Sequence, residues 1–271
     1  MNIQQSTRGA PSSEIMSAVS AINHYKPADV YYLGPDTHWK SASPMHILAV
    51  IPAYNEEECL ARTVSHLVET CPDIDYLVVN DGSRDGTSRI ISKERIHGVT
   101  LPVNSGLTSA FKTGMKYAQR HGYDAVVQFD ADGQHLPEYI PAMSALLEEN
   151  AADIVIASRY LDGSVKPSGL RGVGSRLIST LLKLTAGLNV TDPTSGMRMY
   201  GKTMIDSFAT GFDVAPEPDM LAQAAHRGMK VKEIPCKMLD RQGGTSYLKL
   251  GNAVAYMART TLSILLTTVL R

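Results

Sequence analysis

Short apolar runs alternate with segments of helical periodicity from Met45 onward, and this alternation constrains the fold more than any other feature. The runs His46–Ile51, Asp75–Val79 and Asp153–Ala157 have the length of strands, and helical patterns separate them. Strands that alternate with helices in this way favour a mainly parallel sheet with helices on both faces. We therefore predict an α/β, Rossmann-like fold with a mixed, mainly parallel sheet flanked by helices.

Polar motifs follow three of the predicted strands, at residues 52–57 (PAYNEE), 80–83 (NDGS) and 130–134 (DADGQ). Ligands in such sheets bind beyond the carboxyl ends of the strands, so the three motifs are expected to meet in one crevice. On an extended strand Asp130 and Asp132 project to the same side. Two carboxylates there predict a site for a hard divalent cation that substrate phosphates complete.

The composition excludes some partners. The chain has 271 residues and a formal net charge of -1, without the basic footprint of a nucleic-acid-binding protein. Its three cysteines lack CxxC spacing, so neither a zinc site nor a disulfide framework is expected. No uncharged apolar run reaches the roughly 18 residues that span a bilayer, so we expect a chain that is soluble or lies on a membrane.

Three regions are expected along the chain. Residues 1–44 are rich in Ser, Thr, Pro and Gly and are predicted to form a flexible or loosely docked N-terminal extension. Residues 45–247 form the main domain, and residues 248–271 form an amphipathic C-terminal helix. The pattern over Val173–Leu188 predicts a second amphipathic helix. Each of these two helices either packs on the core or lies against lipid.

Five motifs, in order along the chain, resemble those of family-2 glycosyltransferases with the GT-A fold, in particular the dolichyl- or polyprenyl-phosphate sugar synthases. They are residues 52–57 (PAYNEE), 81–87 (DGSRDGT), 130–135 (DADGQH), 158–159 (SR) and 194–198 (TSGMR). The resemblance covers about residues 46–250. It implies an inverting enzyme that uses Mg²⁺ or Mn²⁺ to move a sugar from a nucleotide-diphosphate donor to a polyprenyl phosphate. It also implies a cytoplasmic protein, peripheral on the inner membrane face, which reaches lipid through its own helices or a small membrane partner subunit.

The family pattern assigns roles to individual positions. The implied metal ligands are Asp130, Asp132 and Gln134. The implied donor site consists of Pro52, Tyr54, Glu56, Val79, Asp81, Asp130, Ala131, Asp132, Gln134, Arg159 and Arg241. The implied acceptor side consists of Arg171, Ser175, Ser195 and Arg198. The implied catalytic residues are Asp132, Asp219 and Arg241.

Some of these positions have a second interpretation. Arg159 is either a phosphate contact or one partner of a salt bridge, and residues 191–198 either face the acceptor or form a turn held by structural hydrogen bonds. Asn80 stands where many relatives have Asp, which removes a charge beside the expected base pocket. Tyr247 stands where dolichyl-phosphate mannose enzymes have Lys, which weakens an assignment to mannose.

Two other functions stay open at this point. One is a transferase that adds a sugar to a hydroxyl acceptor in cell-wall or capsular polysaccharide synthesis, with Asp219 as the general base. The other is a non-catalytic scaffold that binds nucleotide sugars, in which residues 1–44 carry a partner site. Metal-dependent turnover of a donor would exclude the scaffold.

Overall fold

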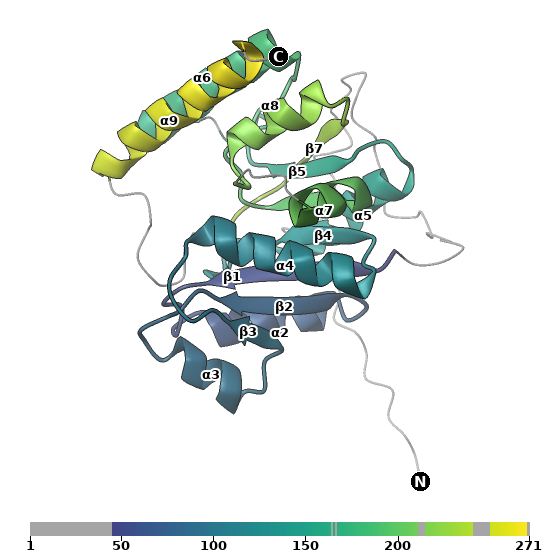
Figure 1. Cartoon of the computed structure of the whole chain (residues 1–271), viewed down its shortest axis with the longest axis vertical. Coiled ribbons are helices and arrows are strands. Elements are labelled where there is room, and N and C mark those ends of the chain that lie inside the picture. The colour runs from purple at the N-terminus through teal and green to yellow at the C-terminus, as the bar shows by residue number, and fades with distance from the viewer. Residues whose placement is uncertain (1–44, 164, 166, 211–214, 241–249, 270–271) are drawn as a thin grey trace. The chain divides into compact units, whose positions relative to one another are not determined.

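The computed structural model describes residues 45–163, 165, 167–210, 215–240 and 250–269. Over these ranges one mixed sheet has seven strands in the order β3-β2-β1-β4-β6-β5-β7 (Figure 1). The strands are β1 (Ile47–Ala53), β2 (Asp75–Asn80), β3 (Gly98–Thr100), β4 (Ala125–Gln128), β5 (Ile154–Ser158), β6 (Arg198–Gly201) and β7 (Val231–Pro235). β6 is antiparallel to its neighbours β4 and β5, and the other pairs are parallel. The predicted fold class is confirmed.

Helices cover both faces of the sheet (Figure 1). They are α2 (Leu60–Thr70), α3 (Thr87–Lys93), α4 (Leu107–His121), the 3₁₀ turn η1 (Pro137–Tyr139), α5 (Ile140–Glu148), α6 (Gly169–Ala186), α7 (Lys202–Thr210), α8 (Pro218–His226) and α9 (Leu250–Val269). Leu48 and Val50 of β1 pack in a core with α4, α6, α7, α8 and α9, whereas Ala49 and Ile51 pack with α2 and α5. Because both faces are buried, the central strands are continuous apolar runs, which is why their sequence pattern is clear.

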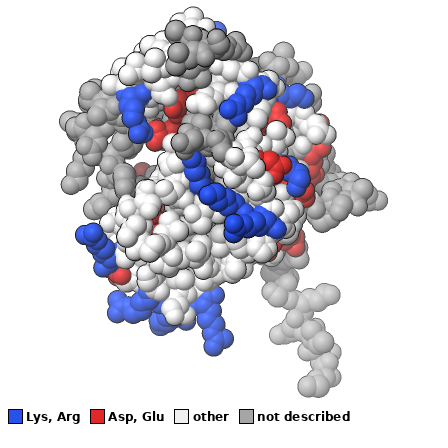
Figure 2. Space-filling model, in the orientation of Figure 1, with Lys and Arg blue, Asp and Glu red and all other residues white. Residues whose placement is uncertain are grey.

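Helix α4 packs closely on the centre of the sheet. Gly114 faces Val50 of β1, and a Cβ at Gly114 would overlap that valine side chain. The opposite face of α4 carries Lys112, Lys116 and Arg120 at four-residue spacing, and Figure 2 shows the row of basic side chains that results. A row of three cations on one amphipathic helix is an ordinary solvated face, consistent with the near-zero net charge of the chain.

The second half of the chain departs from the sequence-based expectation. No strand was predicted for β6 or β7, because β6 begins with Arg198 and β7 carries Lys232 and Glu233 among its five residues. Helix α6 begins at Gly169 rather than at Val173. Short strands with charged residues lack the apolar run from which a buried strand is predicted in a sequence.

Helices α6 and α9 lie side by side (Figure 1), and both contact α8. A Cβ at Gly174 of α6 would come within 2.7 Å of the Met257 methyl carbon of α9, so the glycine permits close packing. None of the helices in the described ranges has the length and apolar character needed to cross a bilayer. The predicted extension 1–44 and the segment 241–249 lie outside the described residues.

Candidate active site

The acidic motif forms a turn just after β4. β4 ends at Gln128, so the prediction that Asp130 and Asp132 belong to an extended strand is wrong. The turn is held by two hydrogen bonds: Asp130 N donates to Nδ1 of His135 at 3.0 Å, and Gln134 N donates to Oδ1 of Asp132 at 3.0 Å. The Asp130 side chain is 37% exposed, whereas Asp132 is buried. The turn therefore exposes one carboxylate partly to solvent and buries the second.

The donor set of this turn fits a hard divalent cation. Such ions take oxygen ligands and complete their shell with water and substrate phosphates, so two carboxylates and the Gln134 amide suffice. No group of three His, Cys, Asp or Glu side chains in the described part of the chain is arranged to hold a metal. The turn could therefore supply only part of a metal ion's ligand shell. Gly196 keeps its approach clear, because a Cβ there would lie 2.9 Å from Oδ2 of Asp130.

Replacing Gly196 with Ala tests this arrangement. The added methyl group should displace the Asp130 carboxylate and weaken Mn²⁺ binding about tenfold, as changes around metal ligands commonly do. Stability should change little, since the crowded atom ends a side chain. Gly201→Ala is the matched control, because a Cβ there meets its nearest atoms at 3.6 Å and 3.7 Å. Mn²⁺ affinity can be measured by electron paramagnetic resonance with a nucleoside diphosphate present. Equal affinities in both variants would show that Gly196 does not keep the approach to Asp130 clear.

The loop after β1 and the loop after β2, which contain predicted donor residues, are joined by hydrogen bonds. Asn55 has a φ of 58°, its N–H donates to Oγ of Ser83 at 3.0 Å, and its Oδ1 accepts the N–H of Arg84 at 2.9 Å. Glu56 N donates to Oγ1 of Thr87 at 2.9 Å. The predicted donor residues 52–56 and the loop after β2 therefore form one unit, as the crevice hypothesis requires.

Asp81 lies buried at the end of β2. Its Oδ1 and Oδ2 accept the N–H groups of Ser105 and Gly106 at 2.8 Å and 2.7 Å. The carboxylate thus shapes the loop before α4, and its remaining lone pairs are those left for a base or ribose. Pro52 and Tyr54 are partly exposed at the same edge, but Val79 is fully buried in the apolar core.

Asn80 is held inside the fold by hydrogen bonds, and its effect on the expected base pocket stays a prediction. It is fully buried, and its Nδ2 donates to Oγ of Ser88 at 2.8 Å and to Oγ1 of Thr100 at 3.3 Å. Its Oδ1 accepts the hydroxyl of Ser83 at 2.6 Å. The amide therefore serves as a structural link between β2, β3 and α3.

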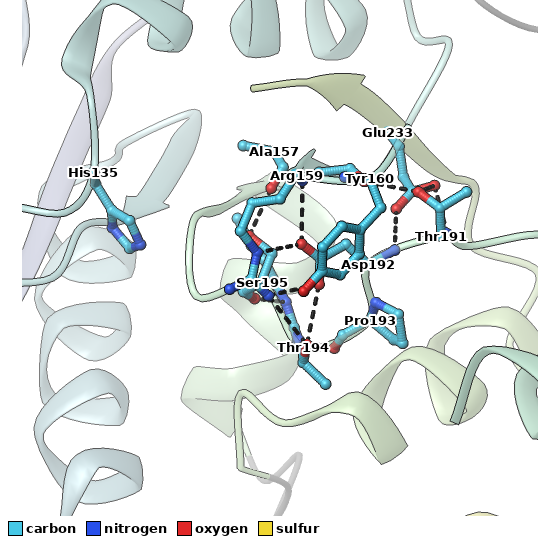
Figure 3. Close-up of polar contacts among 12 residues, drawn as sticks. His135, Ala157, Arg159, Tyr160, Thr191, Asp192, Pro193, Thr194, Ser195 and Glu233 are labelled. Carbon is cyan, nitrogen blue, oxygen red and sulfur yellow. Dashed lines mark hydrogen bonds and ion pairs between the residues drawn. The ribbon is translucent and has the colours of Figure 1, made fainter. Parts of the chain in front are cut away.

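Arg159 forms a bidentate ion pair with Asp192, as the salt-bridge interpretation describes, and its contact with a donor phosphate stays a prediction (Figure 3). Nε and Nη2 of Arg159 donate to the two Asp192 oxygens at 2.6 Å and 2.8 Å, and its backbone N–H donates to Oδ2 at 3.1 Å. Burial lowers the pKa of Arg159, but the hydrogen bonds and charge of Asp192 outweigh it and raise the pKa overall. A fully buried carboxylate needs such a partner.

Glu233 of β7 completes this network. Its carboxylate accepts the N–H and hydroxyl of Thr191 and the N–H of Asp192, at distances of 2.7 to 3.0 Å (Figure 3). Burial raises the pKa of Glu233, while these hydrogen bonds oppose the shift. Asp192 and Glu233 were missed from the sequence: only the position of Asp192 beside the TSGMR motif hinted at a role, and Glu233 gave no signal.

Ser195 and Arg198 of the loop 191–198 make hydrogen bonds inside the protein, and their predicted contact with an acceptor stays a prediction. Ser195 Oγ donates to the Ala157 carbonyl at 2.6 Å. Arg198 is 2% exposed and donates to the carbonyls of Pro193, Ser195, Pro216 and Glu217. Both side chains therefore position the loop beside Asp130.

The remaining predicted residues are distributed around α6 and α8. Asp219 lies in the first turn of α8, where its Oδ2 accepts the Ser263 hydroxyl at 2.6 Å. Ser175 is buried in α6, and its Oγ has no hydrogen-bond partner in the described part of the chain. Ala131 is buried, and its carbonyl accepts the Thr63 hydroxyl. The Arg171 side chain and the whole of Arg241 lie outside the described residues.

Comparisons with known proteins agree on one family. The profile for "Glycosyl transferase family 2" matches residues 48–208. The chain is 34% identical to an undecaprenyl-phosphate mannosyltransferase of Micrococcus luteus over 233 residues, which cover 79% of this chain and 93% of that protein. It is 31% identical to a polyprenol monophosphomannose synthase of Mycolicibacterium smegmatis, over 76% of this chain and 82% of that protein.

Solved structures share the fold. The structure of glucosyl-3-phosphoglycerate synthase from Mycobacterium tuberculosis in complex with Mn²⁺, uridine diphosphate and phosphoglyceric acid matches with a TM-score of 0.62 at 20% identity. The match covers 83% of this chain and 78% of that chain. At this identity the likeness concerns the fold alone. The chain therefore belongs to glycosyl transferase family 2 and is a glycosyltransferase with the GT-A fold.

Proposed function

We propose that this glycosyltransferase moves a sugar, with inversion, from a nucleotide-diphosphate donor to a polyprenyl phosphate at the cytoplasmic face of a membrane. The observation that carries the proposal is the acidic turn of Asp130, Asp132 and Gln134, held beside the loop 191–198 at the ends of the strands. Relatives named for transfer to undecaprenyl phosphate and polyprenol support the acceptor class.

Asp130, Asp132 and Gln134 would hold Mg²⁺ or Mn²⁺, which when bound stabilises negative charge on a departing diphosphate. Tyr54 and Asp81 lie at the edge of the sheet where the base and ribose would bind. On the acceptor side, the Ser175 hydroxyl is buried in α6 without a hydrogen-bond partner among the described residues, and it would hydrogen-bond to the acceptor phosphate.

The hydrogen bonds that Asp219 makes are compatible with a phosphate acceptor. A sugar hydroxyl needs a positioned general base, whereas a phosphate is already anionic when it attacks. Asp219 accepts a 2.6 Å hydrogen bond from Ser263 and another from its neighbour Met220 N, so its carboxylate is engaged in fixing α8. This arrangement favours the polyprenyl phosphate over the hydroxyl acceptor.

Helices α6 and α9 provide the contact with lipid in this proposal. Among the described side chains, the large exposed apolar ones are Val173, Leu177 and Leu184 on α6 and Leu262, Leu265 and Leu266 on α9. Neither helix contains Asp or Glu, and α6 carries the exposed cation Arg176. Exposed leucines beside cations suit an anionic bilayer surface. Since these helices supply the contact themselves, the proposal does not include the small partner subunit.

Replacing Leu184 with Asp should weaken binding to vesicles that contain phosphatidylglycerol by at least about tenfold, because burying one leucine contributes roughly 1.5–3 kcal/mol. Leu184 is 77% exposed, so folding should be unaffected. Val68→Asp, on the exposed side of α2, is the matched control and should bind as the wild type does. Vesicle flotation measures both. A Leu184 variant that floats like the control would remove α6 from the contact.

The proposed function is tested by incubating the protein with a panel of nucleotide sugars and Mg²⁺ or Mn²⁺. Release of nucleoside diphosphate should depend on the metal and rise when a polyprenyl phosphate is added. The corresponding polyprenol, which lacks the phosphate, should give no rise. Transfer to a sugar hydroxyl in place of the lipid phosphate would overturn the proposed acceptor.

A further inference from the structure

The C-terminal helix α9 is bonded to the acidic start of α8. Nη2 of Arg259 donates to both carboxylate oxygens of Glu217, at 2.9 Å and 2.8 Å. One turn further along α9, Ser263 donates to Asp219. Residues four apart lie on the same face of a helix, so one face of α9 holds both carboxylates at the beginning of α8.

The start of α8 is connected in turn to the acidic turn. Nη1 of the buried Arg198 reaches the carbonyls of Pro216 and Glu217 at 3.3 Å, while Nε and Nη2 hold the loop 191–198. Gly196 in that loop faces Oδ2 of Asp130. A set of contacts therefore runs from α9 through Glu217 and Arg198 to the loop 191–198, whose Gly196 faces Asp130.

We propose that Arg259 is a positioning residue that orients and neutralises Glu217, so that an anionic acceptor phosphate can approach the start of α8. This proposal rests on the function proposed above. The Glu217 side chain is 22% exposed, and without Arg259 its charge would repel such an acceptor. Arg259 is 68% exposed and lies on α9 one turn before Leu262, which is also exposed. The helix assigned to lipid contact therefore also holds the Glu217 carboxylate at the start of α8.

Arg259→Ala should raise KM for the polyprenyl phosphate about fivefold, the upper range for an exposed ion pair, while kcat and KM for the donor change little. Adding Glu217→Gln to this variant should return KM towards the wild-type value, because the repelling charge is removed. Arg259→Lys should recover most of the loss. Lys183→Ala is the matched control, since it removes the same charge from the exposed face of α6.

Equal KM values for Arg259→Ala and Lys183→Ala would overturn the proposal, as would a double variant no better than Arg259→Ala. A wild-type protein that transfers no sugar to polyprenyl phosphate would instead contradict the proposed function. In that case amide hydrogen exchange decides. Positioning by Arg259 predicts faster exchange over residues 218–226 in Arg259→Ala than in Lys183→Ala, and equal exchange would reject it.

Discussion

Replacing Asp132 with Asn is expected to lower the rate of sugar transfer about a thousandfold, because a bound cation contributes several kcal/mol to stabilising a charged transition state. Asp132 is 2% exposed, and its Oδ1 accepts the Gln134 N–H at 3.0 Å. Asn has the same shape and retains an oxygen that can accept this hydrogen bond. The variant therefore removes the charge that a divalent ion needs while preserving the turn.

Three measurements separate this effect from misfolding. The thermal midpoint of Asp132→Asn should stay close to that of the wild type, its affinity for Mn²⁺ should fall, and its initial rate should fall with it. Asp73→Asn serves as the control, since Asp73 is an exposed carboxylate in the loop after α2. A rate of sugar transfer within tenfold of the wild-type rate, at saturating metal and donor, would show that the charge of Asp132 is not required for catalysis.

The sequence predicted the elements whose burial is uniform. β1, β4 and β5 are buried almost throughout, as are the last four residues of β2, so each contains an apolar run, and the polar motifs that follow three of these strands mark the edge where ligands are expected to bind. Strands β6 and β7 were not predicted, because Arg198 and Glu233 occupy strand positions where a charged side chain is not expected. Glu233 is accommodated by Thr191 and Asp192, more than 40 positions away, and Arg198 partly by the carbonyls of Pro216 and Glu217, so no local pattern reveals these contacts.

The same limit applies to the candidate site. Asp130, Asp132 and Gln134 were recognised because their motif is short and contiguous, although a turn rather than a strand presents them. The role of Arg159 could not be predicted, because its partner Asp192 lies 33 positions further along the chain. A guanidinium that suits a phosphate suits a carboxylate equally well. Only the fold shows which of the two it meets.

The ion pair between Arg159 and Asp192 leads to the second large expected effect, on stability. Asp192 is fully buried, whereas the Arg159 side chain is 32% exposed. Removing one partner of a buried pair commonly costs 3–5 kcal/mol, and the partial exposure of Arg159 places Asp192→Asn near the lower end, at about 3 kcal/mol. For a chain of this length that corresponds to a fall of about 8 °C in Tm.

Lys93→Ala is the matched control for this loss, because Lys93 pairs with Glu94 on the surface, where the two side chains are 76% and 47% exposed. Such a pair contributes at most about 1 kcal/mol. Calorimetry should therefore separate the two variants clearly. Combining Asp192→Asn with Arg159→Gln should destabilise by less than the sum of the single changes, since the uncompensated guanidinium is removed. If Asp192→Asn is no less stable than Lys93→Ala, the network of Arg159, Asp192 and Glu233 does not hold the loop 191–198 in place, and the alignment of Gly196 with Asp130 must have another cause.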